Sequence, residues 1–313
     1  MLHVRVISPP DRTSAVLDAL SAEPAVVHLV VLAGAARSPR GDVVEFDVVR
    51  EGASAVLDGL KAHHLDTEGA IVVENVDIAL SSRADRAQRR MPGQGVDAVV
   101  WQEIEHVTGE ETRLSASFLV FLAVATAIAG IGVILDQPIL IVGSMVVGPE
   151  FGPLAALCVG AVQRRRGLVG RSALALAVGF PVAMLFTVVT TLLLDAAGLV
   201  DKGMLVAERP LTDFIWRPDA LSWVVGFLAG VAGMLSLTSA KAGTLVGVLI
   251  SVTTVPAAAN AAVALAYGVG DEAAGSALQL VVNMVAIVVA GVLTLLVQQV
   301  VWRRGAQRMA TPR

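Results

Sequence analysis

Two proline-containing stretches in apolar surroundings carry polar groups at a distinctive spacing. The first reads GSMVVGPEFGP over residues 143–153, and the second reads SVTTVPAAAN over residues 251–260. Proline removes a backbone donor and clashes with the preceding helical turn, so both stretches are expected to break a helix. In an apolar setting, freed backbone groups and nearby side chains can bind an ion or small solute. The candidate binding residues are Ser144, Gly148, Pro149, Glu150, Gly152, Pro153, Ser251, Thr253, Thr254, Pro256 and Asn260.

Two uses of these stretches remain open. If they line a cavity, the helix N-termini that follow each break offer N–H groups to an anion, and the carbonyls that precede it can ligate a cation. Prolines and small residues also permit close helix packing without any ligand, a role that the Gly226-x-x-x-Gly230 and Gly243-x-x-x-Gly247 spacings fit. Glu150 is either a functional carboxylate inside the bilayer or the cap of the next half-helix. The occurrence of two such breaks favours a binding site.

The composition indicates what kind of protein positions these residues. The chain has 313 residues, of which 55% are hydrophobic and 16% charged, and its mean hydropathy is +0.74. Of the 50 charged residues, 29 lie in residues 1–113. This distribution predicts an α-helical polytopic membrane protein with a soluble N-terminal part. The single cysteine, Cys158, excludes a disulfide framework and a cysteine-based zinc site. The N-terminus lacks the pattern of a cleavable signal peptide, so we expect the soluble part to stay in the cytoplasm.

A transmembrane domain is predicted over residues 114–302. A helix needs about 20 apolar residues to cross a bilayer. Six runs meet this length, at approximately 114–135, 138–162, 168–194, 220–240, 242–267 and 273–302. Arginines cluster after the second run and in the tail at residues 303–313. The positive-inside rule places such clusters in the cytoplasm, and with six spans this predicts that both termini are cytoplasmic.

The predicted spans also repeat. Aligning Val142-Gly143 with Val246-Gly247 brings Pro153 opposite Pro256 with an offset of one residue. Each motif lies in the middle span of a group of three, and three crossings invert the second group in the membrane. The six helices are therefore expected to form a 3+3 inverted repeat with two broken helices, an arrangement whose binding sites lie near the bilayer midplane.

The N-terminal 80 residues predict a ferredoxin-like βαββαβ domain. Four strand-like segments, at 2–8, 25–33, 43–50 and 70–80, alternate with two helical patterns. The sheet is expected to be antiparallel, with both helices on one face. Residues 1–113 carry 11 basic and 18 acidic residues, and Phe46 is the only aromatic residue before Trp101, so we expect no nucleic-acid partner.

Residues 81–113 are expected to connect the two domains. Residues 81–95 are interpreted as a flexible linker with four arginines, which either contact anionic lipid head groups or are simply solvated. Residues 97–107 predict an interfacial helix lying on the bilayer. Within it, Glu103 and His106 have a spacing found in carboxylate-bridged metal sites, but no second copy exists, so we expect no metal site.

The stretch DQPILIVGSMVVGPEFGPL, preceded by a soluble domain, is similar to a known family. It resembles the bacterial "uncharacterised hydrophobic domain" proteins, a domain of unknown function numbered 389. The resemblance covers residues 114 to about 260 best. It implies a six-span protein of the bacterial cytoplasmic (inner) membrane and supplies no substrate.

These observations favour a secondary transporter or permease for a small solute or ion, with a cytoplasmic regulatory or oligomerisation domain. The alternatives are an oligomeric ion channel and a membrane-tethered sensor or assembly protein. The common nucleophile, zinc and phosphate-loop motifs are missing from the sequence, so we expect no enzymatic activity and no cofactor. The expected partners are the lipid bilayer and further copies of the chain, which would associate through small-residue helix faces.

Overall fold

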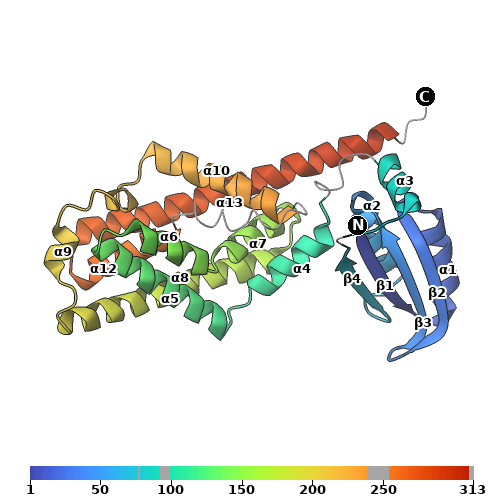
Figure 1. Cartoon of the computed structure of the whole chain (residues 1–313), viewed down its shortest axis with the longest axis horizontal. Coiled ribbons are helices and arrows are strands. Elements are labelled where there is room, and N and C mark those ends of the chain that lie inside the picture. The colour runs from blue at the N-terminus through green and yellow to red at the C-terminus, as the bar shows by residue number, and fades with distance from the viewer. Residues whose placement is uncertain (77, 92–98, 239–253, 310–313) are drawn as a thin grey trace. The chain divides into compact units, whose positions relative to one another are not determined.

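The computed structural model describes residues 1–76, 78–91, 99–238 and 254–309 (Figure 1). The chain divides into two compact units. The N-terminal unit comprises Met1–Ile104 with two short later segments, and the membrane unit comprises Glu105–Leu237 and Lys241–Val297.

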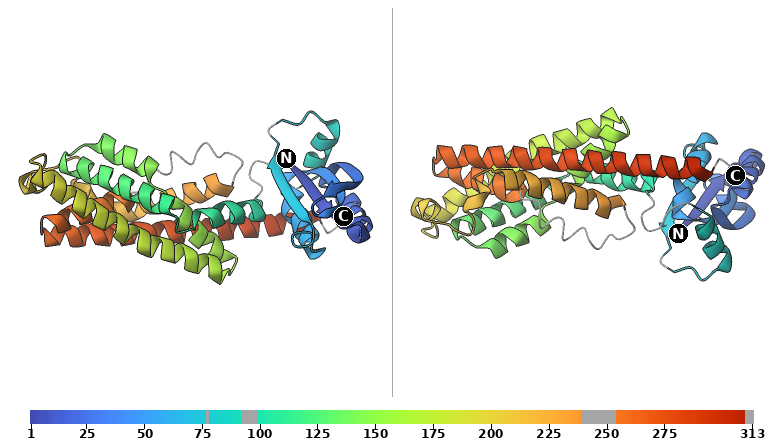
Figure 2. Two further views of the ribbon diagram at one scale, coloured as in Figure 1. Left: turned by 90° about the horizontal axis from the view of Figure 1, so that it is seen from below. Right: turned by 90° about the horizontal axis from the view of Figure 1, so that it is seen from above.

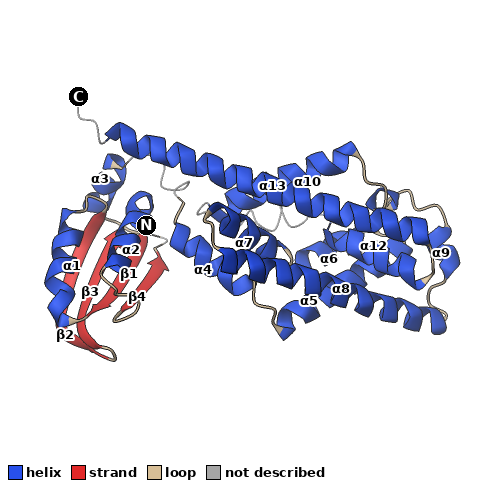
Figure 3. Ribbon diagram, turned by 180° about the vertical axis from the view of Figure 1, so that it is seen from behind, coloured by secondary structure: helices blue, strands red, loops and turns tan. Residues whose placement is uncertain are grey.

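The N-terminal unit is a four-stranded antiparallel sheet with helices. Its elements are β1 (Leu2–Ser8), α1 (Pro10–Ala22), β2 (Val26–Arg37), β3 (Arg40–Val48), α2 (Arg50–Ala62) and β4 (Ala70–Asn75). The strand order is β2-β3-β1-β4, and every neighbouring pair is antiparallel (Figure 3). The antiparallel sheet is confirmed, and the order of elements is the one that the alternating patterns predicted.

Strict alternation in the two central strands builds the core of this unit. Val4 and Val6 in β1 and Val44 and Phe46 in β3 are fully buried, while the residues between them are more exposed. Successive side chains of a strand point to opposite faces, so these four residues share one face of the sheet. They pack in one cluster with buried residues of both helices, namely Val16, Leu20, Val56, Leu57 and Leu60.

Strand β2 differs from its prediction in where it ends. The predicted segment ended at residue 33, but β2 continues to Arg37. Gly34 adopts a φ of 63° and lies in an irregular stretch of the pairing between Leu32 and Ala36. Its N–H donates to Oδ1 of Asp42 at 2.7 Å. A glycine with a left-handed backbone is therefore absorbed by the irregular pairing instead of ending the strand.

The expected flexible linker contains a helix, α3 (Ser82–Arg90). Ser81 caps it by accepting the N–H of Ala84, and Ala84 and Ala87 are buried. The prediction of a flexible linker was wrong because the high density of arginines was interpreted as a sign of disorder. The N-cap at Ser81 and the two buried alanines on one side of the helix are enough to pack α3 against the unit.

The predicted interfacial helix appears as α4 (Trp101–Glu111), and its apolar side does not match the expectation. Val99, Val100 and Ile104 are buried, and Val100 belongs to the core cluster of the N-terminal unit. Glu103 pairs with Arg50 at 2.8 Å and accepts the amide of Asn75 at 3.0 Å. The first turn of α4 therefore packs on protein, and Glu103 is held by an arginine.

The membrane unit is helical. Its described elements are α5 (Ala116–Ile134), α6 (Pro138–Val147), α7 (Phe151–Val162), α8 (Arg166–Ala196), α9 (Lys202–Val206), the 3-10 turn η2 (Asp213–Ile215), α10 (Ala220–Thr238), α12 (Thr254–Ala266) and α13 (Gly270–Met309). Helices α5, α8, α10 and α13 are long and apolar enough to cross a membrane. Helices α6 and α7 make a fifth candidate if the bent pair counts as one span.

Six spans and the inverted repeat stay predictions. The fifth predicted run, 242–267, is described only from Thr254 onward, as the 13-residue helix α12. The described part alone is shorter than the roughly 20 residues that a span requires. Residues 254–264 are buried on every side, and α12 packs against α5, α6 and α8.

Small residues pack α10 against α13, and the two helices lie side by side (Figures 1 and 2). A Cβ added at Gly230 would lie 2.7 Å from the carbonyl oxygen of Ile287 and 2.8 Å from the Cβ of Ala290. The packing role predicted for Gly226 and Gly230 is confirmed. Gly243 and Gly247 lie outside the described residues.

The N-terminal core can be tested at Phe46. Phe46→Ala removes a ring that is 0% exposed, so the free energy of unfolding of this unit should fall by about 3–5 kcal/mol. Hydrogen exchange of β1 and β3 amides in the full-length protein measures it. Val31→Ala, on the outer strand β2 and 40% exposed, is the matched control and should change stability by less than about 0.5 kcal/mol. Equal effects of the two variants would contradict this packing.

Candidate functional site

The break between α6 and α7 begins at a glycine–proline pair. Helix α6 ends at Val147, α7 begins at Phe151, and the two axes are bent by 53°. Gly148 has an extended backbone (φ −66°, ψ 128°), which is the conformation that a following proline favours. Its N–H donates to the carbonyl of Ser144 at 3.0 Å and closes α6. Gly148 and Pro149 therefore cause the break.

Pro153 has a different role from the one predicted, whereas the break predicted at Pro256 stays a prediction because the residues before Thr254 lie outside the described part of the chain. Pro153 lies in the first turn of α7, and Pro256 is the third described residue of α12. The N–H groups of a first turn have no partner within the helix, so a proline there costs no hydrogen bond. Pro153 is therefore compatible with a helix start and does not interrupt α7, and Gly152 beside it is an ordinary buried position of the same turn.

Glu150 and Thr254 bring the two predicted stretches together. The side chain of Glu150 is 1% exposed, and its Oε1 accepts the hydroxyl of Thr254 at 2.9 Å. Its Oε2 is also buried and has no hydrogen-bond partner within the described part of the chain. A Cβ at Gly148 would collide with this carboxylate, so only glycine lets it lie against the backbone of the break. Glu150 occupies the N-cap position of α7 but makes no capping bond with its side chain, so the capping alternative is not supported.

Other predicted residues are not part of this contact. Ser144 is buried, but its hydroxyl donates to the carbonyl of Ile141 in its own helix at 2.6 Å. Ser251 and Thr253 lie outside the described residues.

Asn260 belongs to a second buried polar cluster, six residues after Thr254 on α12. Its Oδ1 accepts from Nη1 of Arg209 at 3.3 Å, and its Nδ2 donates to the hydroxyl of Ser276 at 2.7 Å. Arg209 also pairs with Glu272, and the two side chains are only 5% and 7% exposed. Six residues of helix rise about 9 Å, so α12 carries one polar contact near its described start and another nearly two turns later.

Sequence reasoning missed Arg209 and Glu272. Arg209 precedes η2 and Glu272 lies in the first turn of α13, and both fall between the runs that were predicted to span the membrane. The one signal available was Asn260 itself, because an amide in a buried alanine-rich helix needs partners from elsewhere. The sequence does not say which charged residues supply them.

A cavity of about 590 Å³ lies beside this cluster. Arg209 and Glu272 are among its lining residues, with Glu208, Asp213, Arg217 and Asp271. The segment that carries Arg209 is anchored by Asp136, which accepts the hydroxyl of Thr212 at 2.8 Å and the N–H of Leu211 at 3.3 Å. Asp136 thus holds the wall of the cavity in place.

The membrane unit resembles known proteins. Residues 145–289 match the model of the family "Domain of unknown function (DUF389)", which confirms the resemblance inferred from the sequence. The matched range includes Glu150, Arg209, Thr254, Asn260 and Glu272. The chain is also 22% identical, over 232 residues, to "Uncharacterized protein MJ0678" of Methanocaldococcus jannaschii, covering 74% of this chain and 68% of that protein. No solved structure matches the chain.

The buried pair predicts a large, partner-dependent loss of stability. Arg209→Met or Glu272→Leu leaves an uncompensated buried charge and should each cost about 3–5 kcal/mol, whereas the double variant should recover much of that loss. Thermal unfolding of the detergent-solubilised protein measures this. The exposed pair Arg217–Asp213, at 2.9 Å, is the control, and Arg217→Gln should cost about 1 kcal/mol or less. Single and double variants that melt alike would show that the pair is not buried in solution.

Proposed function

We propose that this chain is a secondary transporter or permease for a small cation or protonated solute, with its binding site at Glu150 and Thr254. The supporting observation is one contact: a buried carboxylate at a helix break, hydrogen-bonded to the first described residue of the buried helix α12. A carboxylate among apolar helices is costly and rarely retained without a task. Helices broken near the midplane are where such proteins bind substrate and coupling ions.

The atoms around Glu150 suit a cation. Oε2 is buried without a partner among the described residues, and the hydroxyl of Thr254 lies beside Oε1. The last carbonyls of α6 also end at this break and lack helical partners. Carboxylate, hydroxyl and carbonyl oxygens are ligands for hard cations, and a proton on the carboxylate would satisfy the same lone pair.

The proposal includes the complete architecture expected from the sequence. In it, six spans form the 3+3 inverted repeat, and α12 belongs to the second broken span as α6 and α7 form the first. Both termini lie in the cytoplasm, the N-terminal unit regulates or oligomerises the protein, and the chain acts as a carrier without enzymatic activity. The cavity beside Arg209 and Glu272 is then an entrance to the binding site from the side of the membrane opposite to the cytoplasm. An oligomeric channel could use the same residues, but its ion flux would not saturate as the flux of a carrier does.

Cysteine labelling in intact cells tests the orientation. Cysteines at Gly203 and Gly270 should react with an impermeant reagent, and a cysteine at Gly167 should not, because arginines next to Gly167 favour the cytoplasmic side. All three glycines are exposed, and the native Cys158 is buried, so background labelling stays low. Labelling of Gly167→Cys from outside would reject the proposed orientation.

Three variants test the binding site. Glu150→Gln keeps the shape of the side chain and removes its charge, so stabilisation of the purified protein by Na⁺ or another small cation should disappear. Thr254→Val removes one hydrogen bond to a charged group and should weaken that response about 10- to 100-fold. Ser144→Ala is the control, because this buried hydroxyl bonds only within its own helix in the described structure, and the variant should respond within about twofold of wild type.

The same variants are then assayed for flux in proteoliposomes. Saturable uptake that is lost in Glu150→Gln and retained in Ser144→Ala supports a carrier, whereas unitary currents with the same dependence would move the assignment to a channel. If Glu150→Gln keeps both the wild-type flux and every cation response, the proposed site is wrong.

A further inference from the structure

Helix α3 is fastened to the sheet of the N-terminal unit at a defined place. His28, in the irregular part of β2 with φ 54°, bonds through Nδ1 to Oδ2 of Asp47 at 2.6 Å and through Nε2 to the hydroxyl of Ser81 at 2.7 Å. The same hydroxyl accepts the N–H of Ala84 and caps α3. Because Ala87 is buried in the core cluster of this unit, the helix has a fixed rotation about its axis.

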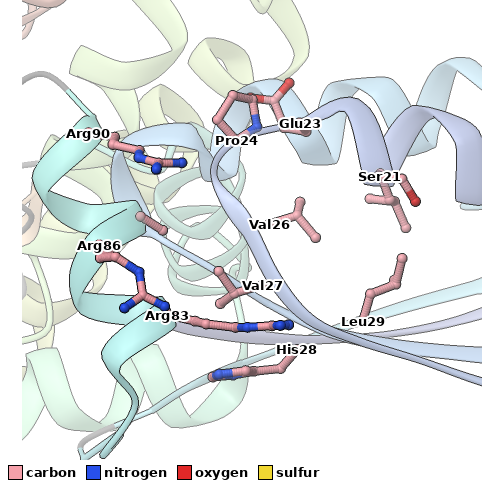
Figure 4. A pocket seen from close by; sticks show the side chains of 12 residues that line it. Ser21, Glu23, Pro24, Val26, Val27, His28, Leu29, Arg83, Arg86 and Arg90 are labelled. Atoms are coloured by element: carbon pink, nitrogen blue, oxygen red, sulfur yellow. The ribbon is translucent and has the colours of Figure 1, made fainter.

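That rotation turns three arginines toward β2. Arg83, Arg86 and Arg90 are spaced i, i+3 and i+7, so they lie on one face of α3. All three line a cavity of about 540 Å³ whose opposite wall comes from the end of α1, from β2 and from the turn between them. Figure 4 shows these side chains with Val26, Val27 and Leu29 of β2. From Arg83 to Arg90 the helix rises about 10 Å.

The charges of this cavity are not balanced by the protein. Arg12, Arg50 and Arg165 each have a carboxylate within ion-pair distance, but no ion pair or hydrogen bond is found for Arg83, Arg86 or Arg90 among the described residues. Glu23 is the one acidic residue in the lining. Three clustered guanidinium groups repel one another, and an anion between them removes that repulsion.

The remaining wall is apolar. Leu20, Pro24, Val26, Val27 and Leu29 lie opposite the arginines, and the volume is that of a site for a small organic molecule. Guanidinium groups bind phosphate oxygens in pairs, and a spread of about 10 Å along the helix suits more than one phosphate group.

We propose that this cavity binds an organic phosphate carrying two or more negative charges, with the phosphates on Arg83, Arg86 and Arg90 and the carbon part against β2. Two sources share this chemistry: a soluble nucleoside diphosphate or triphosphate, and the phosphorylated head group of a membrane lipid. His28 acts as a positioning residue for α3, because both of its ring nitrogens are already bonded within the protein.

Binding to the full-length protein is the test. ATP and inorganic pyrophosphate are added to the protein in lipid-free detergent, and the head group is supplied by nanodiscs with or without phosphatidylinositol 4-phosphate. Titration calorimetry should show binding to wild type that weakens as the salt concentration rises. Arg83→Gln with Arg86→Gln should weaken it at least about 10-fold, a loss of about 1.4 kcal/mol. Arg89→Gln is the matched control: it removes one positive charge from the same helix but does not line the cavity, and it should stay within about twofold of wild type.

A further variant reports on the sign of the ligand charge. Glu23→Gln removes the one acidic lining residue and should tighten binding of ATP or the head group several-fold, an effect that a merely structural role of Glu23 would not produce. Binding of ATP or pyrophosphate identifies the soluble source, and binding only to the phosphorylated lipid identifies the membrane source. Binding of none of the probes, or equal losses in Arg89→Gln and the double variant, would overturn the proposal. Glu150→Gln should leave phosphate binding unchanged, so this outcome is separate from that of the transport proposal.

Discussion

Helix α12 places two polar side chains inside a bundle where each must find a partner in the protein, and the rest of the membrane unit is arranged to provide those partners. Every residue from Thr254 to Ala264 is buried, so neither Thr254 nor Asn260 can turn to solvent. An unpaired buried polar group costs about 1–3 kcal/mol or more. Thr254 is satisfied by Glu150, and Asn260 is satisfied by Arg209 and Ser276. These two requirements bring the α6–α7 break and the segment before η2 to the same short helix.

The two contacts on α12 differ in whether their charges are balanced within the protein. Around Asn260, Arg209 and Glu272 neutralise each other, and the amide uses both its oxygen and its nitrogen, while Nε of Arg209 has no partner among the described residues. Around Thr254, one carboxylate oxygen of Glu150 is bonded and the other has no partner among the described residues. A network whose charges neutralise each other mainly determines which structure forms, whereas a carboxylate with a free lone pair can exchange a proton or cation. The difference is why the binding proposal centres on Glu150 and why Asn260, although predicted as a site residue, is better explained as part of the scaffold.

The N-terminal unit distributes charge in a comparable way. Arg50 joins Asn75 and Glu103, and so ties β4 and α4 to the start of α2. Three arginines of α3 face a cavity with a single acidic residue in its lining. The fold alone explains the paired arginine, whereas the unpaired arginines are the basis of the proposed phosphate site. Each unit thus combines charges used for assembly with charges available for binding, although one is built from strands and the other from apolar helices.

Periodicity and composition determined much of this protein from the sequence alone. The alternation of Val4, Val6, Val44 and Phe46 with polar residues was sufficient to predict the antiparallel sheet, and the apolar runs predicted membrane helices. Gly148 and Pro149 predicted a broken helix because the backbone preferences of these residues are local. Local patterns were ambiguous where composition was unusual: the arginine-rich α3 was taken for a linker, and the role of Pro153 depended on where the helix began. Tertiary structure decided the partners. Glu150 and Thr254 are 104 residues apart and Arg209 and Glu272 are 63 apart, and no periodic pattern connects residues at such separations. A local pattern indicates that a polar side chain is buried, but its partner depends on how the helices pack against one another.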